Sequence, residues 1–205
     1  MLFKAATALV TLLAITSAAP SIIESRQFDE YYVIPTVKLP GSPLDGKSIV
    51  AQNGNFFINR EKATTTCVVT APCDTLSNRT MIIFSNANYT AKLNSYVPGG
   101  QIVYISSTGQ FQYLPTHSTK LPEGAIAQSF IRTEFFPTGS SAYAGIIWKG
   151  RNWVACPVAG KTGVFQIQTA AIGHRSECVD IHVEALELGG DKTPQAYEYI
   201  SPYGV

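Results

Sequence analysis

Short β-branched and apolar runs joined by Gly or Asn turns constrain the fold of this chain most. Beyond the N-terminus, no long segment places apolar residues at the i, i+3, i+4 and i+7 positions of a helix. Three segments instead join an Ile/Val-rich run to an aromatic-bearing run across a polar turn, which is the pattern of a β-hairpin. These hairpins are predicted over residues 48–59, 101–115 and 145–157, with turns at 53–54, 107–109 and 149–152.

The spacing of these hairpins predicts an all-β fold. Further strand-like runs follow at 80–86, 164–170 and 178–186. Since the hairpins recur at similar intervals along the chain, we expect one compact domain over residues 47–205, barrel-like or trefoil-like. The stretch 19–46 contains four prolines without helical periodicity and is expected to form an irregular N-terminal arm.

Residues 1–18 have the layout of a secretory signal peptide. Lys4 precedes an apolar run, and small residues at Ser17, Ala18 and Ala19 suit cleavage after Ala18. The apolar run is shorter than the roughly 18–20 residues of a membrane span. We therefore expect a secreted protein, found outside the cell or in the cell wall.

The charge balance argues against several partners. Loss of Lys4 with the signal peptide leaves 14 basic residues against 14 acidic ones. Without a basic stripe, nucleic acid is not an expected partner. No later segment is apolar enough to span a membrane, and the last residues lack the apolar tail of a lipid-anchor signal. We expect neither a membrane partner nor a cofactor, and the oligomeric state is left open.

Four cysteines in an oxidising compartment indicate two disulfides. Cys67, Cys73, Cys156 and Cys178 allow three connectivities. Pairing within local segments favours Cys67–Cys73 and Cys156–Cys178. No C-x-x-C occurs and no histidine stands at zinc-finger spacing from a cysteine pair, so a metal site is not expected.

Two Asn-x-Thr triplets are N-glycosylation acceptors. Asn78 and Asn88 both lie in a Ser/Asn/Thr-rich region between the two cysteine pairs. We expect at least one of them to be glycosylated, which would place this region on the surface.

The stretch ACPVAGKT, residues 155–162, matches a relaxed phosphate-binding loop. That motif works only where a helix N-terminus follows and points its N–H groups at the phosphates. Here Gly163 and a strand-like run follow instead. We therefore expect a turn between two strands and no nucleotide site.

Candidate catalytic groups are few. Asp180, His182 and Glu184 alternate along one face of a strand, where they could ligate a metal or exchange protons, but alternation also gives every half-buried strand a polar face. The histidines are His117, His174 and His182, no G-x-S-x-G elbow occurs, and the acidic residues are scattered. We expect no enzymatic activity, although a hydrolase with dispersed carboxylates stays open.

Two tryptophans flank the turn at 149–152. Exposed rings at Trp148 and Trp153 could stack on sugar rings, although most tryptophans of small β proteins pack in the core. They are the candidate carbohydrate contacts of the sequence.

The segment 153–186 resembles the C-terminal half of the fungal cell wall proteins named for phialide development (PhiA-like), whose relatives include IgE-binding allergens. The resemblance over this segment rests on an aliphatic residue before Ala155-Cys156-Pro157, on Gly163 and Phe165, and on Cys178-Val179 at the start of the last apolar strand. It implies a secreted, wall-associated glycoprotein with a structural or developmental role and no catalytic residues. It also supports pairing Cys156 with Cys178.

Together these observations favour a secreted, non-enzymatic glycoprotein associated with the fungal cell wall, with wall polysaccharide as its partner. The alternative is a secreted carbohydrate-binding or host-directed effector protein.

Overall fold

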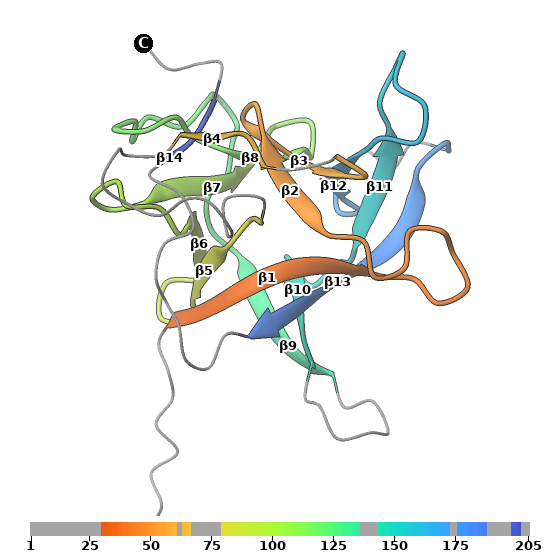
Figure 1. Cartoon of the computed structure of the whole chain (residues 1–205). Helices are drawn as coiled ribbons and strands as arrows, with labels where there is room; N and C mark the ends of the chain where they lie inside the picture. Colours follow the sequence, from red (N-terminus) through yellow and green to blue (C-terminus); the bar gives the residue numbers. More distant parts are fainter. Residues whose placement is uncertain are drawn as a thin grey trace, which may run out of the picture.

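A computed structural model describes residues 30–60, 63–66, 79–135, 143–172, 176–187 and 198–201. Within these ranges every regular element is a strand and none is a helix, so the predicted all-β class is confirmed (Figure 1). The strands are β1 (Glu30–Lys38), β2 (Ile49–Gln52), β3 (Asn55–Ile58), β4 (Thr65–Thr66), β5 (Ile82–Ser85), β6 (Thr90–Leu93), β7 (Gln101–Ile105), β8 (Phe111–Tyr113), β9 (Phe130–Phe135), β10 (Tyr143–Trp148), β11 (Trp153–Pro157), β12 (Phe165–Thr169), β13 (Val179–Glu187) and β14 (Glu198–Tyr199).

The strand pairings close into a ring. Antiparallel neighbours run in the order β1-β5-β6-β7-β8-β3-β12-β11-β13, and β13 then pairs with β1. β2 is added beside β3, while β10 and β9 extend from β13 outside the ring. β14 and β4 form a separate two-stranded sheet at the other end of the molecule from β9 (Figure 1).

The strand that closes the ring lies within the predicted N-terminal arm. Residues 30–38 form β1, which pairs with β5 from Glu30 to Val33 and with β13 from Val33 to Lys38. The prediction of an irregular segment is therefore wrong for these residues. Pro35 is tolerated because its pairing with β5 has already ended at Val33, so only one side of β1 is paired there.

Two of the three predicted hairpins are confirmed. β2 and β3 turn at Asn53 and Gly54, whose φ angles of 50° and 76° are those of the two-residue turn expected there. β7 and β8 turn over residues 106–110, where the N–H of Ser106 donates to the carbonyl of Gln110.

The third predicted hairpin, at 145–157, is wrong. β10 and β11 are both antiparallel to β13, so they run in the same direction and do not pair as a ladder. A tight turn at Lys149 and Gly150 brings Trp148 and Arg151 together, and the chain then resumes its course along β13. The predicted position of the turn is confirmed. Whether the strands on either side of it pair with each other depends on distant residues, here those of β13.

An aromatic cluster fills the interior of the ring. Phe111 stacks on Phe56 with ring centroids 4.0 Å apart, and it also contacts Phe130 and Trp153. Phe84 meets Phe130 edge-on from β5. Burial of each ring removes a large apolar area from water. The rings come from β3, β5, β8, β9 and β11, so their packing joins strands that are distant in the sequence.

The C-terminal strand β14 is held by a buried polar contact. The Tyr199 backbone N–H donates to Gln101 Oε1 at 2.7 Å, and Gln101 Nε2 donates to the Tyr199 carbonyl at 2.8 Å. The Tyr199 ring lies edge-on to Tyr113 in the core, and its hydroxyl accepts from the Met81 N–H at 3.2 Å.

Several predicted features lie outside the described residues. They are the signal peptide 1–18, the rest of the arm before Glu30, and Cys67, Cys73, Asn78 and His174. In the described part of the chain, no helix is long and apolar enough to cross a lipid bilayer.

Candidate functional site

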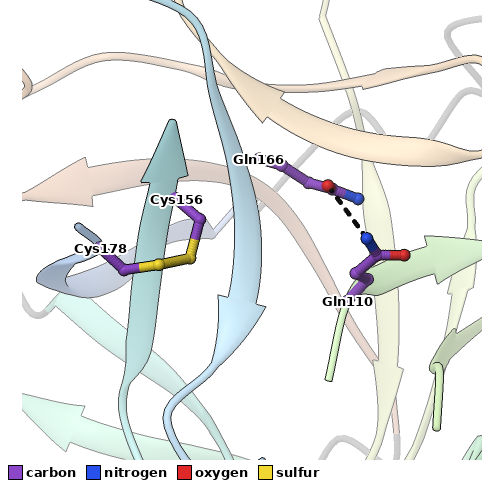
Figure 2. The surroundings of a disulfide bond; sticks show 4 residues. All are labelled: Gln110, Cys156, Gln166 and Cys178. Carbon is purple, nitrogen blue, oxygen red and sulfur yellow. Dashed lines mark hydrogen bonds between the residues drawn. A yellow bond between two sulfur atoms is a disulfide. The ribbon is translucent and has the colours of Figure 1, made fainter. Parts of the chain in front are cut away.

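One predicted disulfide is confirmed and joins neighbouring strands. The sulfur atoms of Cys156 and Cys178 are bonded, 22 residues apart in the sequence (Figure 2). Cys156 belongs to β11, and Cys178 comes directly before β13, where Ala155 pairs with Val179. Both cysteines are buried, and with Val154 they form a small apolar cluster outside the main core. The bond therefore fixes the register of β11 against β13.

The Gly-Lys-Thr stretch is a turn, as predicted. It connects β11 and β12, the Val158 N–H donates to the Val164 carbonyl, and both Gly160 and Gly163 have positive φ angles. A strand follows it, so no helix N-terminus is directed at a phosphate.

Both tryptophans are buried, so neither ring is available as the candidate carbohydrate contact, and both pack in the core as most tryptophans of small β proteins do. Trp148 and Trp153 have 0% and 1% of their surface exposed. Trp153 Nε1 donates to the Ile146 carbonyl at 2.6 Å, and Trp148 Nε1 donates to the Gln128 carbonyl at 2.8 Å. Each indole therefore packs in the interior with its one donor satisfied.

The polar residues of β13 lie on its outer face. Asp180 and His182 are exposed, Ile181 and Val183 are buried, and Glu184 forms an ion pair with Lys38 on β1 at 3.8 Å. Over the described ranges, no three His, Cys, Asp or Glu residues gather in a way that could hold a metal ion.

Four side-chain amides form a closed hydrogen-bonded ring on the outer side of β3, β8 and β12. Gln112 Nε2 donates to Asn55 Oδ1 at 2.7 Å and to Gln110 Oε1 at 3.2 Å. Gln110 Nε2 donates to Gln166 Oε1 at 3.3 Å, the contact drawn in Figure 2. Gln166 Nε2 completes the cycle by donating to Asn55 Oδ1 at 2.8 Å. We call Asn55, Gln110, Gln112 and Gln166 the amide ring.

Strand pairing explains why these amides meet. Asn55 on β3 and Tyr104 on β7 are both cross-strand partners of Gln112 on β8, so the three side chains share one face of the sheet. On the opposite face of the same strands, Phe56 and Phe111 point into the core. All four amides are half-buried, which leaves part of each available to solvent.

A groove of about 430 Å³ begins at the amide ring. Gln112 and Tyr104 lie on its sheet side, and Pro115, Ser118 and Lys120 line it from the chain that follows β8. The groove thus offers a hydroxyl, a cation and an amide next to the uncharged amide ring, while Tyr104, with 4% of its surface exposed, forms part of the groove wall.

Sequence reasoning missed the amide ring. Its local sign is the alternation of glutamines and aromatic residues in Gln110-Phe111-Gln112, repeated in the Phe165-Gln166 pair. Such alternation predicts a polar outer face. Whether the amides bond to one another depends on strands that are distant in the sequence. Asn55 and Gln166, for example, are 111 residues apart.

Asn88 is the predicted glycosylation acceptor that the structure describes. It lies at an exposed position in the turn between β5 and β6. Its placement fits an acceptor site, and its occupancy stays a prediction.

Comparison with known proteins places the chain in a family. The profile of the PhiA-like secreted proteins matches residues 36–200, which is most of the chain. The chain belongs to the PhiA-like secreted protein family. The resemblance stated from residues 153–186 is therefore confirmed, and the match extends across the ring from β1 to β14.

A relative of this PhiA-like chain is an uncharacterized secreted protein from Arthroderma benhamiae, a fungus. The two are 32% identical over 122 residues, which are 56% of this chain and 62% of the relative's length. No solved structure matches the chain. Family and relative are both described as secreted, so the protein is secreted, as the sequence predicted.

Proposed function

We propose that this PhiA-like protein is a non-enzymatic structural glycoprotein of the fungal cell wall, retained there by binding a neutral wall polysaccharide at the amide ring. Membership of a secreted family supplies the location outside the cell. The closed ring of four amides on an outer sheet face is the observation that supports the binding role.

The chemistry of the amide ring suits sugar hydroxyl groups. A primary amide both donates and accepts hydrogen bonds and has no charge to desolvate. Within the described part of the chain, Gln112 Oε1 accepts no hydrogen bond, and Gln110 and Gln166 each use one of their two N–H donors in the ring. Donors and acceptors are therefore left side by side, as a row of hydroxyl groups requires.

The amide ring is also ordered before any ligand arrives. Each amide is held by at least one neighbour on another strand, and the strands are fixed by the aromatic core beneath them. Ordering a free glutamine on binding costs about 0.5–1.5 kcal/mol, and the existing hydrogen bonds reduce that cost.

The composition of the groove supports a binding role without catalysis. Among the described residues that line it, none is Asp or Glu. Hydrolysis of a glycosidic bond ordinarily requires two carboxyl groups on either side of the bond. The groove instead extends the contact surface with Ser118 and Lys120.

A sedimentation assay with insoluble polysaccharides tests the proposal. The secreted protein is mixed separately with β-1,3-glucan, chitin and mannan, and the bound fraction is measured. We expect binding to at least one polymer, and we expect Gln112→Ala and Gln166→Ala to weaken it about tenfold or more, since each variant opens the ring. Unfolding in urea is measured for each variant to exclude loss of fold.

A matched control removes an exposed amide elsewhere. Asn152 is exposed beside the turn at Lys149 and Gly150 and takes no part in the hydrogen bonds of the amide ring, so Asn152→Ala should bind like the parent. Failure of the parent protein to bind all three polymers, or equal losses in Asn152→Ala and Gln112→Ala, would show the proposed function to be wrong.

A further inference from the structure

A second depression lies at the turn between β5 and β6, and the amide ring contributes nothing to it. Its volume is about 480 Å³, within the range of small-molecule sites. Asn88 and Tyr89 line it from the turn, Gln128 and Ser129 from the chain before β9, and Lys149 from the end of β10.

The backbone around this depression is held in a costly conformation. Tyr89, Ser129 and Lys149 have φ angles of 54°, 75° and 49°, in the left-handed region that residues with a side chain rarely adopt. Each such residue costs on the order of 1–3 kcal/mol, and such residues gather at functional sites. The described chain has six of them, and three meet at this depression.

Hydrogen bonds fix the three segments beneath the depression. The Phe130 N–H donates to the Tyr89 carbonyl and the Lys149 N–H donates to the Ser129 carbonyl, both at 3.0 Å. Phe130 itself is buried in the aromatic cluster, and Lys149 Nζ covers the Trp148 ring at 4.6 Å. The floor of the depression is therefore rigid and continuous with the core.

The Tyr89 ring is presented at this rigid floor. It is 55% exposed, the largest exposed fraction of the large apolar side chains in the described residues. A tyrosine face in solvent offers an apolar surface with a polar rim, and the C–H face of a pyranose ring complements such a surface.

Asn88 is the residue that points to the occupant. It precedes Tyr89 in the acceptor triplet Asn88-Tyr89-Thr90, and it lines both this depression and a smaller one of about 170 Å³ beside Glu30 and Lys92. A sugar attached at Asn88 Nδ2 therefore starts at the edge of the Tyr89 depression. A tether this short gives an effective concentration in the millimolar range or above.

We propose that Asn88 is N-glycosylated and that the first N-acetylglucosamine residues of this glycan lie in the depression, with one sugar face against the Tyr89 ring. Gln128 and Ser129 supply hydrogen bonds to the hydroxyl and acetamido groups. The same chemistry could be met by a free N-acetylglucosamine oligosaccharide, and attachment at Asn88 favours the glycan of the same chain.

The experiment uses protein secreted by a eukaryotic host and carrying Asn78→Gln, so that Asn88 is the remaining acceptor. Mass spectrometry first measures its occupancy, with Asn88→Gln as the unglycosylated reference. We expect Tm to be higher in the glycosylated form by about 2–4 °C. Trimming by an endoglycosidase to a single N-acetylglucosamine should preserve most of the shift, because that sugar contacts Tyr89.

Variants at Tyr89 separate a specific contact from mere attachment. The glycan-dependent Tm shift is measured within each variant, so any direct effect of the substitution on stability cancels. Tyr89→Ala should abolish the shift and Tyr89→Phe should retain it, since the ring face is what the sugar meets. An unoccupied Asn88, or an equal shift in Tyr89→Ala and the parent, would overturn the proposal.

A second measurement distinguishes the attached glycan from a free ligand. N,N′-Diacetylchitobiose is titrated into each form while the NMR signals of Tyr89 are followed. The Asn88→Gln protein should respond at millimolar sugar, and the glycosylated protein should not respond because its depression is filled. An equal response from both forms would show that the depression is open, and the attached glycan would then be excluded as its occupant.

Discussion

Gln101 and Tyr199 hydrogen-bond to each other twice, at 2.7 and 2.8 Å, so that one side-chain amide takes the place of a second strand partner for β14, whose other partner is β4. The same Gln101 Nε2 also donates to the Leu114 carbonyl at 3.1 Å. All three contacts are buried, and 98 residues separate Gln101 from Tyr199.

Gln101→Ala should lower the free energy of unfolding by about 2–3 kcal/mol, because it leaves buried backbone groups of Tyr199 and Leu114 without partners. Urea unfolding measures the change. Gln112→Ala is the matched control, since Gln112 is half-buried on the same sheet and its loss should cost only about 1 kcal/mol. Equal costs for the two variants would contradict the role given to Gln101.

The stability of the protein should fall between about pH 10 and pH 12. Burial raises the pKa of the Tyr199 phenol to about 12, although the Met81 N–H partly opposes it, and burial also raises the pKa of Tyr113. The unfolded chain ionises these tyrosines near pH 10, so above that pH it has released protons that the folded protein still binds. The free energy of unfolding therefore decreases as pH rises through this window and is unaffected by these groups below it.

Each tyrosine should contribute up to about 1.4 kcal/mol per pH unit inside the window. Urea unfolding at a series of pH values measures the slope. Tyr199→Phe removes one ionising group and should make the slope shallower while lowering stability at neutral pH through loss of the hydroxyl contact. A slope that does not change in Tyr199→Phe would rule out this assignment.

Removing the disulfide should destabilise the fold without abolishing it. The bond closes a loop of 22 residues, and the chain-entropy relation gives about 3 kcal/mol for a loop of that size. The double variant Cys156→Ala, Cys178→Ala is compared with the parent by thermal and urea unfolding. Mass spectrometry of the unreduced protein should also find Cys67 linked to Cys73, and a peptide linking Cys67 to Cys156 would contradict both pairings.

Two glycines with similar backbone angles should respond differently to alanine. Gly109 has a φ of 88°, and a Cβ there would stand 2.7 Å from the Ile172 carbonyl oxygen. Gly160 has a φ of 72°, and a Cβ there would meet nothing within 4 Å. Gly160→Ala should therefore cost about 1–2 kcal/mol for the left-handed backbone alone, and Gly109→Ala should cost clearly more. Unfolding in urea compares them, and similar costs would refute the close approach at Ile172.

Tryptophan fluorescence should report two sheltered indoles. Since Trp148 and Trp153 are buried with their N–H groups bonded to carbonyls, native emission should be poorly quenched by acrylamide and should become strongly quenched on unfolding. Addition of polysaccharide should leave this emission unchanged. A large spectral change on sugar binding would restore the tryptophans as contact residues.

The features that the sequence predicted correctly depend on neighbouring residues. The Asn53-Gly54 hairpin, the turn at Gly160 and the Cys156–Cys178 bond each lie within one short segment, where turn chemistry and chain distance decide the outcome. The all-β class follows from the same local patterns.

The features that the sequence did not predict depend on distant pairings. The sequence did not predict β1, because Pro35 lies within it and further prolines flank it, and because its partner β13 lies far along the chain, towards the C-terminus. The direction of β10 and β11 is likewise set by β13. The amide ring requires β3, β8 and β12 to be neighbours, an order that no local pattern contains.

The pairing of β1 with β13 also has a consequence for the order of events during biosynthesis. Val33 and Glu187 are partners, so the segment that emerges early must wait, with an open edge, until almost the whole polypeptide has been made. Such distant pairing slows folding, because a long loop must close before the contacts can form. Until then the β1 edge is exposed to other nascent chains, and the secretory pathway has to protect it from premature association.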